Sequence, residues 1–234
     1  MVTLLQFTVG NYRSFHQART FSMVPSSIQD NPKECVVAEG HYRYLTAAAV
    51  YGANSSGKSN LVMALATMKS MVLNSVKLND HDFLFYDPFL LAEDSGNQPT
   101  HFEIVYLDAD ETRVRYGFDY TLRQIEREWL FISKKNKKEL PYFVRDEEGI
   151  GVDEMLFAEG IGLEERTNDN RLFLSLVAQL GGTISKNVLD FFNSGYNVIS
   201  GLNSQGYEGL TERQFLNKEA ESVDALQFFK DLQL

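Results

Sequence analysis

One octapeptide constrains the fold of this chain more than any other feature of its sequence. Residues 52–59 read Gly-Ala-Asn-Ser-Ser-Gly-Lys-Ser and match the pattern G-x-x-x-x-G-K-[ST] in full. An apolar run, Leu45 to Tyr51, precedes the octapeptide, and a helix-patterned segment, Asn60 to Leu73, follows it. Strand, loop and helix in this order are the context in which the pattern holds phosphate groups. The sequence therefore predicts a phosphate-binding loop rather than a chance turn of glycine and serine.

The residue types in the loop explain how it can hold an anion. Small residues let the backbone curl until successive N–H groups point at one polyphosphate, and the following helix directs the positive end of its dipole at the same charge. Lys58 is expected to reach the β- and γ-phosphates, and the Ser59 hydroxyl is expected to bind the Mg²⁺ that bridges them. ATP and Mg²⁺ are thus the expected ligands. The candidate binding residues are Gly52, Ala53, Asn54, Ser55, Ser56, Gly57, Lys58, Ser59 and Asn60.

Composition and charge exclude several other classes. With 44% hydrophobic residues the 234-residue chain is typical of globular proteins. Its net charge of −10 argues against extensive non-specific binding of nucleic acid. Lys134 to Lys138 could still contact a nucleic-acid backbone or form a solvated turn. The single Cys35 gives no disulfide framework. No apolar run reaches the ~18 residues of a membrane span, and no secretory signal opens the chain, so no membrane contact and a cytoplasmic location are expected.

Three regions differ in their apolar periodicity. Residues 1–75 alternate as strands and then carry the loop and its helix, residues 76–150 alternate with period two between short turns, and residues 151–234 have helical spacing. Short connections between strands predict antiparallel pairing. The polar segment Ile28 to Arg43 is predicted to be a connection, and Ser200 to Gly209 a loop. The expected strands are Leu5–Val9, Ala18–Val24, Phe102–Leu107, Arg113–Leu122, Ile125–Ser133 and Leu140–Val144.

The N-terminal motifs resemble those of a known family. A strand ending in Asn11-Tyr12-Arg13-Ser14-Phe15, a second strand, and then the run from Val50 to Leu61 resemble the N-terminal lobe of the ABC-type ATPases related to SMC proteins, RecF and the OLD nucleases. The chain is most similar to AAA-type, RloA-like bacterial proteins, many of which are encoded beside phage-defence genes. The resemblance spans about residues 1 to 195. Three weaker elements of that subgroup are also present, at Pro88-Phe89-Leu90, Tyr116-x-Phe118 and Glu128-x-Leu130.

The resemblance implies a mixed α/β fold of the P-loop NTPase class, with a mixed sheet, an antiparallel β subdomain and a helical C-terminal part, which together form one incomplete ATPase head. It places Arg13 beside the bound nucleotide, with an ordinary surface arginine as the alternative. It offers Gln179 as a candidate for the glutamine that senses the metal and the attacking water. The family's partners are a second head, which gives a homodimer or higher oligomer, and an effector protein such as a nuclease or toxin.

Other elements of that family are not found in the sequence. Ile104 to Asp108 reads as a hydrophobic strand ending in Asp, but Ala109 follows where the catalytic Glu should be, and Leu202 to Gly206 only faintly resembles the signature motif. We therefore assign no catalytic residue, and expect a first lobe whose hydrolysis of ATP needs a second lobe. Two alternatives stay open: a self-contained P-loop kinase or GTPase with Asp108 as its metal-side carboxylate, and a non-hydrolysing, ATP-sensing scaffold.

Overall fold

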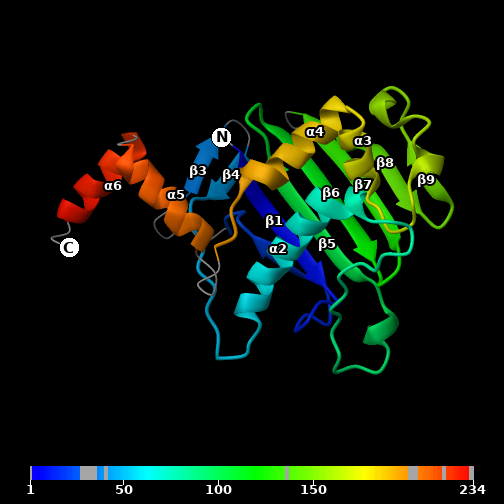
Figure 1. Cartoon of the computed structure of the whole chain (residues 1–234), viewed down its shortest axis with the longest axis horizontal. Coiled ribbons are helices and arrows are strands. Elements are labelled where there is room, and N and C mark those ends of the chain that lie inside the picture. Colours follow the sequence, from blue (N-terminus) through cyan, green and yellow to red (C-terminus); the bar gives the residue numbers. More distant parts are fainter. Residues whose placement is uncertain are drawn as a thin grey trace. The chain divides into compact units, whose positions relative to one another are not determined.

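The computed structural model describes residues 2–26, 36–39, 42–134, 137–199, 205–217 and 220–231. The chain divides into two compact units, Met1–Tyr196 and Asn197–Leu234. The first unit contains all the strands described, together with the predicted loop and the helices α2, α3 and α4 (Figure 1). The second unit contains the helices α5 (Gln205–Leu216) and α6 (Ala220–Asp231).

A seven-stranded sheet forms the frame of the first unit (Figure 1). Its strand order is β2-β1-β5-β6-β7-β8-β9, and each pairing described in it is antiparallel. The mixed α/β class is therefore confirmed, with a sheet whose described part is antiparallel. The strands are β1 (Thr3–Gly10), β2 (Arg19–Ser22), β5 (Thr100–Leu107), β6 (Thr112–Tyr120), β7 (Ile125–Lys134), β8 (Leu140–Asp146) and β9 (Gly149–Val152).

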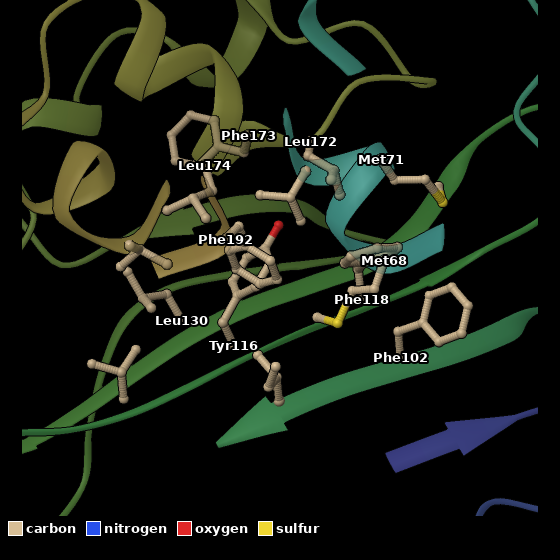
Figure 2. Close-up of a cluster of buried hydrophobic side chains, with 14 of the residues drawn as sticks. Met68, Met71, Phe102, Tyr116, Phe118, Leu130, Leu172, Phe173, Leu174 and Phe192 are labelled. Carbon is tan, nitrogen blue, oxygen red and sulfur yellow. The ribbon is translucent and has the colours of Figure 1, made fainter. Parts of the chain in front are cut away.

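One face of this sheet carries the main hydrophobic core. Along β6 the alternate residues Tyr116, Phe118 and Tyr120 are fully buried, as period-two spacing of aromatic residues predicts. The helix α2 (Lys58–Asn74) buries Ala64, Met68 and Val72 against the same face. Figure 2 shows Met68 and Phe118 in this cluster of buried side chains. The predicted helix after the loop is thus confirmed, and its apolar stripe fixes the end of the loop on the sheet.

Two short helices complete the layer on this face. They are α3 (Phe173–Gln179) and α4 (Thr183–Asp190), followed by a π-helical turn, Phe191–Gly195. Gly181, with φ 108°, ends α3 in the left-handed conformation that favours glycine. In the second unit, Gln205 to Gly209 are helical, so the predicted loop is wrong there; its first residues, 200–204, lie outside the described ones. No described helix is both long and apolar enough to span a membrane.

The opposite face of the sheet carries a smaller cluster that depends on a bulge. Simple alternation along β1 would place Leu5 on the same face as Phe7 and Val9. The register of β1 against β5 shifts between Leu4 and Gln6, so Leu5 lies on the opposite face. A two-stranded hairpin, β3 (Val36–Glu39) and β4 (Tyr42–Leu45), supplies a partner for this cluster. The cluster consists of Leu5, Tyr44, Val105 and Leu107, with Tyr42 packed against it. The prediction of a plain connection from Ile28 to Arg43 is therefore wrong for β3 and for the start of β4.

The apolar run in front of the loop does not form the predicted strand. The strand β4 ends at Leu45, and residues 46–51 are exposed and without regular structure. Val50 is 49% exposed and Tyr51 91% exposed. A strand of this composition is stable when neighbouring strands pair with its backbone and cover its side chains. In the described part of the chain no strand pairs with residues 46–51, which explains the difference.

Candidate functional site

The predicted loop, residues 52–59, connects this exposed segment to α2 and contains two residues in the left-handed conformation. Ser55 has φ 64° and Gly57 has φ 95°, and Gly57 lies directly before Lys58, the first residue of α2. The Ser56 N–H donates to the Ala53 carbonyl over 3.2 Å. Left-handed residues between right-handed ones turn successive N–H groups to one side and so create a concave anion site. The local backbone therefore has the conformation that phosphate binding requires.

The loop's free donors are consistent with this geometry. Among the residues that the structure describes, the N–H groups of Asn54, Ser55 and Gly57 have no hydrogen-bond acceptor. The first N–H groups of a helix also lack an acceptor within the helix, and α2 begins at Lys58. Unpaired donors and the positive end of a helix dipole thus occur in one short segment, which favours an anion.

Lys58 lies across the loop. Its Nζ donates to the carbonyl oxygens of Gly52 and Ala53, each over 2.7 Å, and lies 3.5 Å from Ser56 Oγ. An ammonium group has three protons and acts as a mobile point charge. The side chain is therefore held where a phosphate bound by the loop amides would meet it. Ser59 follows in the first turn of α2 with an exposed side chain, as a metal-binding hydroxyl requires.

The turn after β1 contacts the loop. Ser14 Oγ lies so close to Gly57 that a Cβ at this glycine would meet it at 2.6 Å. Asn60 Nδ2 donates to the same Ser14 oxygen over 2.9 Å. The neighbouring Tyr12 hydroxyl bonds the Thr67 hydroxyl of α2 at 2.9 Å, and burial raises the pKa of Tyr12. The structure thus places Asn60, and the turn that carries Arg13, beside the loop.

Arg13 has one strong partner, which sequence reasoning did not identify. Its Nε donates to Asp87 Oδ2 over 2.7 Å, and its backbone N–H donates to the Asp87 carbonyl over 2.8 Å. Asp87 directly precedes the element Pro88-Phe89-Leu90, which was the only signal in the sequence. Ser14 was likewise missed, although it belongs to the strand-end motif that carried the resemblance.

Two other candidates lie elsewhere. Gln179 is the last residue of α3 and is exposed, and no described contact joins it to the loop. Asp108 lies in the tight turn between β5 and β6, where its carboxylate accepts the Ala109 N–H over 2.7 Å. Both neighbours of β5 are antiparallel, so the parallel strand end that a kinase or GTPase site at Asp108 requires does not occur there.

The remaining features add no second site. In the residues described, no group of three or more His, Cys, Asp or Glu side chains could hold a metal ion. Lys135 and Asn136 of the lysine-rich turn lie outside the described residues, as does most of Leu202 to Gly206.

The loop with Lys58 and Ser59 fits a polyphosphate and its metal, because it offers unpaired amides, a cation and a hydroxyl together.

A loop with this sequence and geometry, in a mixed α/β fold with a large antiparallel sheet, defines a P-loop NTPase domain, and such domains bind nucleotides. Comparison with protein families agrees. The family described as "AAA domain, putative AbiEii toxin, Type IV TA system" matches residues 47–225, well over half of the chain. The chain belongs to this family of P-loop ATPases. No curated protein matches its sequence. The matched region begins just before the loop, so β1, β2 and Arg13 lie outside it.

Proposed function

We propose that the chain is the Mg-ATP-binding lobe of a dimeric ATPase of the ABC and SMC type. The observation that carries this proposal is the loop itself, in which left-handed Ser55 and Gly57, the start of α2 and the Nζ of Lys58 converge. The amides and Lys58 would hold the β- and γ-phosphates, and Ser59 would ligate Mg²⁺. When bound, the metal would neutralise phosphate charge and orient the terminal phosphoryl group.

In this proposal, hydrolysis requires a second lobe, and nucleotide binding drives two heads together. Positioning of the attacking water and stabilisation of the transition state are separate tasks from phosphate binding, and we assign no residue of this chain to them. The exposed residues 46–51 support the proposal, because strand-forming residues beside a binding loop are suited to pairing with a further strand.

The proposed cellular role is to gate an effector protein, a nuclease or toxin, in defence against phage. Support comes from two sources: the motifs that resemble RloA-like proteins, and a family description that names a toxin–antitoxin system. A cytoplasmic location belongs to the same proposal, because ATP is abundant there.

Lys58→Ala tests the site. We expect Mg-ATP affinity, measured by isothermal titration calorimetry, to fall on the order of 10- to 100-fold, the effect of losing a charge-assisted hydrogen bond to phosphate. The fold should persist, because the described contacts of the Lys58 Nζ are confined to the loop. Lys77→Ala is the matched control, since the described hydrogen bond of this lysine goes to Asn74, the last residue at the other end of α2. Unchanged affinity in Lys58→Ala would refute the site.

The assembly is tested by measuring molar mass in solution while Mg-ATP is added, with ATP alone as the control. We expect ATP-dependent association and very slow turnover by the isolated chain. A turnover of about 1–100 s⁻¹, the range of kinases, would contradict the need for a second lobe.

A further inference from the structure

Arg13 is held in an unusual way for an arginine in a surface turn. Its backbone is left-handed, with φ 47°, and Asp87 contacts it twice, through the backbone N–H and through Nε. A non-glycine residue in this conformation is strained, so the surrounding contacts must maintain it. The two contacts from Asp87 are the ones that fix both the backbone and the side chain of Arg13.

Because Asp87 accepts from Nε of Arg13, the Nη1 and Nη2 groups at the end of the guanidinium remain available to donate to a ligand. Arginine carries five N–H donors, one on Nε and four on Nη1 and Nη2. In the described part of the molecule neither Nη atom has a hydrogen-bond partner, and the group lies 5.5 Å from the Tyr12 ring centroid. Four donors on a planar fork therefore remain for a ligand, in the arrangement that matches phosphate oxygens.

The neighbour of Arg13 in the chain shows how near the loop this residue lies. Ser14 touches Gly57 and bonds Asn60, and consecutive Cα atoms are about 3.8 Å apart. Arg13 therefore lies one residue from a direct contact with the loop. The segment that carries Asp87 is fixed to the same turn by Asn11, which is buried, accepts the Phe89 N–H, and donates to the Ser95 carbonyl over 2.9 Å.

We infer that Asp87 is a positioning residue for nucleotide binding, which holds Arg13 by Nε so that its Nη groups are presented to the polyphosphate. This inference rests on the proposed function. A purely structural role explains the pair less well, because both side chains are partly exposed, at 29% and 39%, and such ion pairs add little to stability. Ordering a long side chain before binding, by contrast, improves affinity directly.

The test compares Asp87→Ala and Asp87→Asn with the full wild-type chain, by titration with ATP in excess Mg²⁺. We expect Asp87→Ala to weaken binding about 3- to 10-fold, the effect of ordering one long side chain. Asp87→Asn should stay close to wild type, because its amide oxygen still accepts from Nε. Asp146→Ala is the charge control: it removes one carboxylate at the end of β8, far along the strand order from β1.

The double variant Arg13→Ala/Asp87→Ala shows whether Asp87 acts through Arg13. We expect it to bind as weakly as Arg13→Ala alone, since groups that act as a unit are not additive. Additive losses would overturn the inference. So would tighter binding in both Asp87 variants, which would mean that the carboxylate acts only by repelling phosphate. If wild type binds and Lys58→Ala does not, an unchanged Asp87→Ala refutes Asp87 alone, whereas equal binding by wild type and Lys58→Ala refutes the proposed function.

Discussion

Two tyrosines of β6 show how much a single hydroxyl contact matters. Tyr116 and Tyr120 are both fully buried, and burial raises the pKa of each phenol above its ordinary value. The Tyr116 hydroxyl donates to Glu128 Oε1 over 2.9 Å. The Tyr120 hydroxyl has no hydrogen-bond partner among the atoms described. The Thr100 hydroxyl donates to the Asn11 carbonyl over 2.7 Å. A buried hydroxyl stabilises the fold only when it is bonded.

Removing the hydroxyl group is expected to have different effects on stability at these two tyrosines. Tyr116→Phe should lower the free energy of unfolding by about 1–3 kcal/mol, because Glu128 loses a donor inside the core. Tyr120→Phe should change it by less than about 0.5 kcal/mol or raise it slightly, because the lost group was not bonded. Urea unfolding of the two variants beside wild type measures both values. Equal losses would show that the Tyr120 hydroxyl has a partner.

Among the secondary-structure elements, one carboxylate joins the sheet to a helix. Glu128 of β7 is fully buried and accepts the N–H groups of Phe173 and Leu174, at 2.7 and 3.1 Å, at the start of α3. The N-cap of α3 is Leu172, which has no side-chain oxygen, so a strand supplies the acceptor that capping residues usually provide. This contact gives a physical reason for the Glu-x-Leu element noted in the sequence.

The same carboxylate predicts a pH dependence of stability. Burial raises the pKa of Glu128 above its ordinary value, although the helix N–H groups, Arg145 and Tyr116 oppose the shift. A raised pKa means that folding favours the protonated form. This contribution to stability is therefore complete below the ordinary glutamate pKa and is lost as pH rises through the folded-state pKa. The stability of wild type relative to Glu128→Gln should accordingly fall as pH rises from 4 toward neutrality.

Urea unfolding of both proteins across this pH range measures the difference. Glu128→Ala serves as the reference for losing the acceptor altogether, and should cost more than about 3 kcal/mol, because three buried donors are left unbonded. A difference between wild type and Glu128→Gln that is flat with pH would show that burial does not shift this pKa.

Local patterns predicted the elements whose cause is local. The strands from β5 to β8 follow from alternation, and the turn after Leu107 follows from its Asp-rich sequence. The helix α2 follows from its apolar stripe. The prediction of a strand in the run before the loop was wrong, because periodicity shows which residues can be buried but not whether a partner strand exists. In the site, the loop was predicted from its motif. The contact of Arg13 with Asp87 joins residues far apart in sequence, and the element beside Asp87 does not indicate which residue it contacts.

At the scale of the whole molecule, the first unit closes its core with its last residues. The Phe191 ring stacks on Tyr106 of β5 with centroids 3.7 Å apart. Tyr196 is the last residue of the unit; its hydroxyl donates to the Leu65 carbonyl over 3.3 Å, and its own carbonyl accepts from Lys69 Nζ over 2.8 Å. Both partners belong to α2, so the end of the unit is fixed to the helix that follows the loop.

These contacts predict that residues 1–196 fold without the second unit. Each buried apolar residue of the two described clusters lies before residue 197. A chain ending at Tyr196 should therefore keep its melting temperature within about 4 °C of wild type, the shift expected from about 1 kcal/mol. Circular dichroism should show cooperative unfolding with less helical signal.

A chain ending at Leu180 is the matched control. It lacks Val188, Phe191 and Phe192, and it should fail to unfold cooperatively, because their removal exposes Tyr106 and Tyr116. If the longer variant were also unfolded, α5 and α6 would have to stabilise the core, and the division at Tyr196 would be wrong.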